Sequence, residues 1–215
     1  MTTTERVRFV GKPLVFAVCL VPALLVVSDL FGITGTLGAN PVEEILDRFG
    51  NWGLRFMMIA LAVTPLRVIT GHGWIGRFRR MLGLFAAFYV FVHFLVWLVL
   101  DQGVYLPGII EDIVERPFIT IGMVALLLLG AMAATSTAGM RRRMGRLWQR
   151  LHYGAYLAGV LGVWHYWWQV KADILEPAIY AAILTLLLGF RLWRKLMRPS
   201  RPTQRSAVPA AQTGS

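Results

Sequence analysis

The chain alternates between long apolar stretches and short polar ones. Six windows have about the length and apolarity that a membrane-spanning helix needs, roughly 20 mostly apolar residues. Most charged side chains lie between these windows. The pattern predicts an all-α integral membrane protein with six transmembrane helices, at residues 12–30, 52–69, 81–100, 118–134, 151–168 and 174–192.

Charged residues are distributed by loop rather than evenly along the chain. Arginines gather around residues 67–80 and 141–150, whereas acids gather around 29–47 and 101–115. Because loops rich in Lys and Arg stay on the cytoplasmic side of a membrane, this alternation predicts that both termini are cytoplasmic. The net charge is +11, and the other basic residues gather at the N-terminus and in the tail from Arg191 onward. This distribution indicates contact with membrane lipid and not with nucleic acid.

Composition supports a membrane protein without a soluble domain. Hydrophobic residues make up 57% of the chain and charged residues 15%, against roughly 25% charged in soluble proteins. We expect residues 1–11 to be a cytoplasmic N-terminus, 12–195 the membrane domain and 196–215 a disordered cytoplasmic tail. The stretch GHGWIG at 71–76 matches a dinucleotide fingerprint, but no strand precedes it, and it is interpreted as a turn.

Three of the four histidines, His93, His152 and His165, lie inside predicted spans. Ionisable side chains are costly in a membrane and mark functional sites by default. One interpretation is that each histidine only hydrogen-bonds to a neighbouring helix. The other is that they are axial ligands of haem iron, which a helical bundle can bury between facing helices. A covalently attached haem is not expected, because the chain has no C-x-x-C-H sequence.

The depth of each histidine predicts how they would pair. At 1.5 Å per residue, His93 and His165 lie roughly 20 and 22 Å from their basic loops, and His152 only about 3 Å from its own. His93 and His165 are therefore expected to share one haem, and His152 to mark a second, inner position. That position has no histidine partner, because the residue 14 before His93 is Arg79. A guanidinium stays protonated, so Arg79 would instead pair with a haem propionate or a phosphate.

Several longer motifs match a known family. The chain resembles the MsrQ (formerly YedZ) family, the haem-binding membrane subunits of the periplasmic methionine sulfoxide reductase system, within the ferric reductase-like transmembrane group. The resemblance covers about residues 25–195. It is carried by GANPVEEI at 38–45, TPLR at 64–67, RRMLGL at 79–84, RPFITIG at 116–122, TSTAGMRRRMGRLWQRLH at 135–152 and HYWWQVK at 165–171.

The resemblance implies a b-type cytochrome of the bacterial cell inner membrane, with one or two haem b groups. It implies electron transfer from the quinone pool, or from a cytoplasmic flavin reductase, to a periplasmic molybdenum-cofactor (MsrP-like) catalytic subunit that repairs oxidised methionine. His93, His152 and His165 match the family's haem ligands, and Arg79 and Arg80 its basic pair. FMN is also implied, without a residue to place it. The wider group has a fourth histidine where this chain has Arg79.

Two other functions stay open at this point. A ferric or superoxide-forming reductase would use the same haem site with other partners. A transporter or assembly protein would use the histidines only for interhelical hydrogen bonds and would bind no haem. In either redox interpretation the chain carries electrons and does no chemistry on methionine sulfoxide itself.

Overall fold

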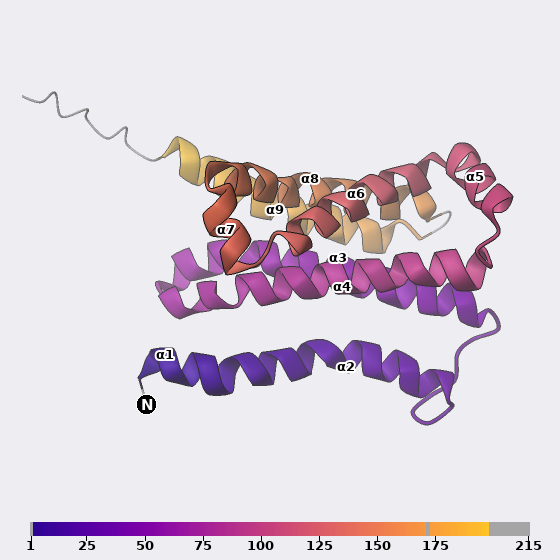
Figure 1. Ribbon diagram of the computed structural model, residues 1–215, viewed down its shortest axis with the longest axis horizontal. Helices are drawn as coiled ribbons and strands as arrows, with labels where there is room; N and C mark the ends of the chain where they lie inside the picture. The colour runs from indigo at the N-terminus through magenta and orange to yellow at the C-terminus, as the bar shows by residue number, and fades with distance from the viewer. Residues whose placement is uncertain (1, 171–172, 198–215) are drawn as a thin grey trace, which may run out of the picture.

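The computed structural model describes residues 2–170 and 173–197, and in this part of the chain every regular element is helical. The long helices lie side by side and alternate in direction, so that α1 and the end of α9 lie at the same end of the bundle (Figure 1). The helices are α1 (Thr3–Arg6), α2 (Lys12–Leu30), α3 (Pro41–Thr70), α4 (Arg79–Val96), α5 (Leu106–Glu115), α6 (Pro117–Ala134), α7 (Ala138–Met144), α8 (Arg146–Gln169) and α9 (Leu175–Leu196).

The two ends of this bundle differ in charge. We call the end that holds the loop 31–40 and α5 the acidic end, because α5 carries three carboxylates. We call the opposite end, which holds α1, α7 and the last turn of α9, the basic end, because α7 carries three consecutive arginines. This division follows the alternation of loop charge in the sequence.

Five helical segments are long and apolar enough to cross a membrane. The predicted fifth span, α8, has 24 residues, but its first turns carry Arg146, Gln149 and Arg150. In the described part of the chain it does not reach the apolarity of the other five, so its crossing of the membrane stays a prediction. The five segments are Thr3–Leu30, Pro41–Thr70, Arg79–Asp101, Pro117–Ala134 and Leu175–Leu196.

Several helices begin earlier than hydropathy predicts. The first begins at Thr3 and not at residue 12, because a π-helical segment, Val7–Gly11, continues it into α2. α3 begins at Pro41 and not at residue 52, because the Asn40 side chain caps its first turn. The polar residues of that first part hide the helix from a hydropathy scan. The predicted loops at 101–117 and 135–150 contain α5 and α7, and the predicted tail lies mainly outside the described residues.

A proline interrupts α2 in its middle, and a side chain from α4 bonds to the backbone next to it. Pro22 cannot continue the backbone ladder of the helix. The Tyr89 hydroxyl inserts beside it, donating to the Cys19 carbonyl at 2.8 Å and accepting from the Ala23 N–H at 3.1 Å. Tyr89 is fully buried, so this contact fastens α2 to α4 inside the bundle.

A second proline opens α3 in the same way. Pro65 has no N–H, so the carbonyl of Leu61, four residues earlier, loses its partner within the helix. The Arg191 guanidinium of α9 supplies the missing donor, with Nη2 at 2.5 Å from the Leu61 oxygen. This contact fastens α9 to α3 nearer the basic end.

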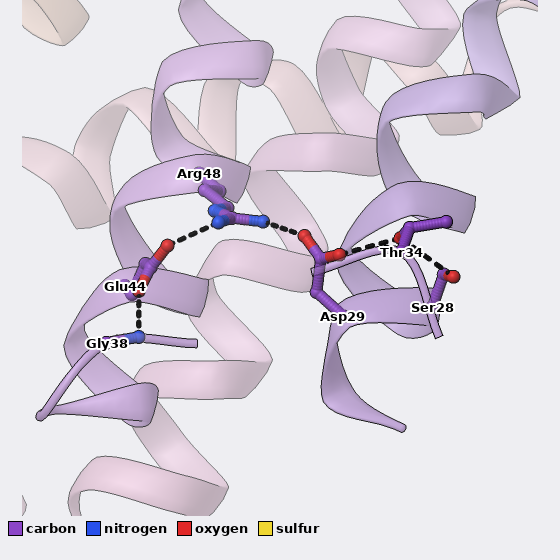
Figure 2. A network of polar contacts seen from close by, with 6 residues as sticks. All are labelled: Ser28, Asp29, Thr34, Gly38, Glu44 and Arg48. Carbon is purple, nitrogen blue, oxygen red and sulfur yellow. Dashed lines mark hydrogen bonds and ion pairs between the residues drawn. The ribbon is translucent and has the colours of Figure 1, made fainter. Parts of the chain in front are cut away.

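Polar side chains fasten the loop 31–40 to the acidic end (Figure 2). Arg48 on α3 donates to the Asp29 carboxylate at the end of α2 and to Glu44 one turn earlier. Asp29 also accepts from the Thr34 hydroxyl at 2.7 Å, and Glu44 accepts from the backbone N–H of Gly38. Arg48 therefore lies between two carboxylates that hold both ends of the loop.

Candidate functional site

A cavity of about 720 Å³ lies between α3, α4, α6 and α8, toward the acidic end. This volume falls within the usual range for small-molecule and cofactor sites, roughly 300–1,000 Å³. His93 and His165 both line it, and His152 is not among its lining residues. Its wall is mainly apolar, with polar side chains that include Glu43, Asp47, Asn51, Asp101, Glu115, Arg116, Tyr166 and Gln169.

His93 is held on α4 by the backbone of α3. Its Nδ1 lies 2.9 Å from the carbonyl oxygen of Leu46. Because a carbonyl only accepts, Nδ1 carries the proton and Nε2 is left free as the other ring nitrogen. The ring lies over Gly50, where a Cβ atom would come within 2.9 Å of Nδ1. The absence of a side chain at Gly50 is what lets the imidazole reach the carbonyl.

His165 is held on α8 by α6 in the same arrangement. Its Nδ1 lies 2.7 Å from the carbonyl oxygen of Phe118. The ring lies over Gly122, where a Cβ would come within 2.9 Å of Nδ1. In both helix pairs, α3 with α4 and α6 with α8, the accepting carbonyl lies four residues before the glycine. The two histidines are therefore held in the same way.

The two imidazoles face one another inside the cavity. Their ring centres are 6.2 Å apart, and the ring planes are inclined by 85°. Metal–imidazole bonds are about 2 Å long and the bonded nitrogen lies about 1 Å from the ring centre, so two imidazoles on opposite sides of one metal have centres about 6 Å apart. This separation is that of two axial ligands of one metal, and the pairing of His93 with His165 on one haem stays a prediction.

His152 has a different environment near the basic end. Its ring stacks on Trp148, with ring centres 3.8 Å apart, and its Nδ1 lies 3.0 Å from the carbonyl oxygen of Trp148. The Trp148 indole in turn donates to the Thr135 carbonyl at 3.0 Å. The structure brings no second histidine to His152, so the part of the prediction that concerns an inner position still lacks a ligand partner.

Arg79 and Arg80 form the start of α4, and both side chains are exposed. The charge of Arg79 acts on His152, which places Arg79 beside the inner histidine and away from the cavity lining. Arg80 is brought to neither site. The structure thus separates the five predicted residues into the pair His93 and His165, the neighbours His152 and Arg79, and Arg80 on the surface.

Sequence reasoning missed Gly50 and Gly122, which give the histidines access to the backbone. The sequence contains a sign of this arrangement. Each glycine precedes its histidine by the same number of residues, 43 from Gly50 to His93 (93 − 50) and 43 from Gly122 to His165 (165 − 122). It also missed Trp97, one turn after His93. This indole lines the cavity, and its Nε1–H has no acceptor among the residues that the structure describes.

Comparison with known proteins now gives these residues a family context. The family described as "Ferric reductase like transmembrane component" matches residues 49–163. No solved structure matches the chain.

Three relatives are each described as "Protein-methionine-sulfoxide reductase heme-binding subunit MsrQ". The protein from Xanthomonas oryzae pv. oryzae (strain MAFF 311018) is 47% identical over 215 residues, which cover 98% of this chain and 99% of that protein. The protein from Xanthomonas campestris pv. campestris (strain 8004) is 52% identical over 175 residues, covering 81% of this chain and 80% of the relative. That from Ralstonia nicotianae (strain ATCC BAA-1114 / GMI1000) is 48% identical over 182 residues, covering 83% of each. The chain therefore belongs to the MsrQ family of multi-pass membrane proteins, within the ferric reductase-like transmembrane group.

Proposed function

We propose that this protein is a b-type cytochrome, the membrane subunit that passes electrons to a protein-methionine-sulfoxide reductase. The observation that carries the proposal is the pair of imidazoles in the cavity, each with Nδ1–H given to a backbone carbonyl. Such a bond fixes the ring orientation and leaves Nε2 for the metal, as is usual for metal-bound histidines. The names of the relatives, which describe heme-binding subunits, support the same group.

The residues around the cavity fit a haem. His93 and His165 would be its axial ligands, and the apolar wall would exclude water from the ring. The Trp97 indole N–H is a buried donor on that wall, suited to a carboxylate of the bound group. The Arg116 guanidinium also lines the cavity, at the acidic end of the bundle. Its positive charge would partly offset the negative charge of the neighbouring carboxylates. Haem, when bound, supplies a one-electron carrier within the membrane.

The proposed orientation places the basic end in the cytoplasm of a bacterial inner membrane. We count α8 as the sixth span, since it packs along α6 through most of the bundle. The arginines at its start then lie at the membrane surface, where they can contact lipid headgroups. The cavity would lie toward the periplasmic face, within reach of a molybdenum-containing, MsrP-like catalytic subunit.

Electrons are proposed to enter at the basic end, from quinol or a cytoplasmic flavin reductase. His152 would mark an inner haem position there, with Arg79 beside it to pair with a propionate or with the phosphate of FMN. Arg80 would serve the same purpose from the surface. The catalytic subunit, and not this chain, would then reduce methionine sulfoxide in envelope proteins.

The first test is a dithionite-reduced minus oxidised visible spectrum of the purified full chain, with haem and protein quantified together. A b-type spectrum with two haems per chain would support both positions. One haem per chain would restrict the proposal to His93 and His165. A folded preparation from haem-replete cells that contains no haem would overturn the cytochrome function. Reduction of soluble ferric complexes without any periplasmic subunit would favour the ferric reductase alternative.

A further inference from the structure

A cluster of cationic and titratable side chains lies near the basic end, where α3, α4, α8 and α9 meet. The guanidinium carbon of Arg191 lies 5.1 Å from the ring centre of Tyr156 on α8. His152 lies one turn before Tyr156 on the same face of that helix. The charge of Arg79 acts on both Arg191 and His152. Two arginines and a histidine from three helices therefore share one neighbourhood.

Among the described residues, no carboxylate forms an ion pair with Arg191. Its Nη1 is fully buried and finds no hydrogen-bond acceptor in the described part of the chain. The groups that act on its charge are the Tyr156 phenol and the like-charged Arg79, and neither is a carboxylate. A partly buried guanidinium with an unpaired terminal nitrogen is strongly unfavourable unless an anion accompanies it.

The structural role of Arg191 explains the position of Nη2 but not that of Nη1. Nη2 serves the Leu61 carbonyl that Pro65 leaves without a donor. Beside Pro22 the neutral hydroxyl of Tyr89 bonds to the backbone instead, donating to the Cys19 carbonyl and accepting from the Ala23 N–H. A neutral side chain can thus bond to the backbone beside a proline in this bundle, and it avoids burying a charge. The charge of Arg191 and its free Nη1 need another explanation.

We propose that Arg191, together with Arg79, forms an anion site that takes the phosphate or carboxylate of a group bound at the basic end. Arg79 opens α4, whose first turn contains no acidic residue and no side-chain cap. The free backbone N–H groups of that turn add to the positive potential. The inference deepens the proposed function, since a haem propionate and a flavin phosphate have this chemistry. A phospholipid headgroup has it as well.

The test compares Arg191→Gln with Lys195→Gln in the purified full chain. Lys195 is an exposed cation one turn further along α9, so it is the matched control. Haem, acid-released flavin and co-purified phospholipid are each quantified per chain. We expect Arg191→Gln to retain at least tenfold less of one of the three, and Lys195→Gln to match the native protein. The ligand that is lost identifies the source of the anion. Native amounts of all three in Arg191→Gln would overturn the inference.

The same substitution in a Pro65→Ala variant separates loss of anion binding from loss of folding stability. Pro65→Ala returns an N–H to position 65, so the Leu61 carbonyl regains a partner within α3 and no longer depends on Arg191. In Pro65→Ala the further change Arg191→Gln should still lower retention of the same ligand, at an unchanged unfolding temperature. Restored retention in the double variant would assign Arg191 a structural role only and overturn the anion site.

Failure of the cytochrome function would be recognised separately. If the native chain contains no haem, inorganic phosphate and FMN are titrated into it, and the unfolding temperature is followed. A rise in the native protein and in Lys195→Gln, but not in Arg191→Gln, would support the anion site by itself. Equal responses in all three proteins to both ligands would overturn it.

Discussion

At the acidic end His93, His165 and Arg48 have partners within the chain, whereas at the basic end one nitrogen of Arg191 has no acceptor among the described residues. His93 and His165 each give Nδ1–H to a carbonyl, and Arg48 lies between two carboxylates. At the basic end, His152 stacks on a tryptophan without a facing histidine, and Arg191 has an unpaired terminal nitrogen. In the described residues, the buried side-chain nitrogen without a partner is a neutral indole N–H at the acidic end, that of Trp97, and a charged guanidinium nitrogen at the basic end, that of Arg191.

The difference indicates how each region holds its ligand. Around His93 and His165 the protein fixes both imidazoles in advance, which would lower the cost of ordering them if they bind the proposed haem. Around Arg191 the protein supplies positive charge and donors, and an anionic group would complete the arrangement. We therefore expect the acidic-end site to depend on geometry and the basic-end site to depend on charge.

Removing one imidazole should have the largest effect on the acidic-end site. His93→Ala and His165→Ala should each abolish the whole signal of the cavity haem, because both ligands act on one iron. The measurement is haem per chain together with the low-spin electron paramagnetic resonance spectrum. His152→Ala should remove only a separate, inner component, and His72→Ala, in an exposed loop, should remove nothing. If either His93→Ala or His165→Ala kept the full signal, the pairing of the two histidines would be wrong.

Adding a methyl group beside either imidazole should weaken the site without removing a ligand. In Gly50→Ala or Gly122→Ala the new Cβ would lie 2.9 Å from Nδ1, so the ring must leave its carbonyl. Loss of such a supporting hydrogen bond typically lowers metal affinity by about 10- to 100-fold. The measurement is a haem titration of the apoprotein. Gly130→Ala is the control, because nothing lies within 4 Å of its Cβ position on α6. Equal affinities in all three variants would contradict the proposed role of the glycines.

These glycines mark the limit of what the sequence predicts about the site. Loop charge and apolar windows predict an all-helical membrane protein with its ends distinguished by charge, and depth along the helix pairs His93 with His165. Access to a backbone carbonyl depends on which helices pack together, and a hydropathy window does not contain this information. Arg191 was hidden for the same reason, because its contact with Leu61 joins residues 130 positions apart. The early start of α3 was hidden by the polar residues of its first turns.

Tyr89→Phe tests whether a neutral hydroxyl stabilises the backbone beside a proline. Without its hydroxyl, the Cys19 carbonyl and the Ala23 N–H lose a shared partner inside the bundle. We expect the free energy of unfolding to fall by about 1–2 kcal/mol, the usual cost of leaving a buried polar group unpaired. The measurement is reversible unfolding in detergent, with haem content unchanged. In a Pro22→Ala background the helix can close its own ladder, so the same substitution should cost less. Equal costs in both backgrounds would assign the hydroxyl no role specific to the proline.

Arg48→Gln should have the smallest effect, and it separates the two kinds of arginine most directly. The side chains of Arg48 and Glu44 are about one-third exposed and that of Asp29 is 13% exposed (contacts in Figure 2), so water can replace part of what the ion pairs contribute. The unfolding temperature should fall by about 2 °C or less, and haem, flavin and phospholipid should stay at native amounts. Arg191→Gln should show the opposite profile, with a bound group lost. If Arg48→Gln also released a bound group, positive charge anywhere in the bundle would hold ligands. The contrast between the paired Arg48 and the partly unpaired Arg191 would then explain nothing about function.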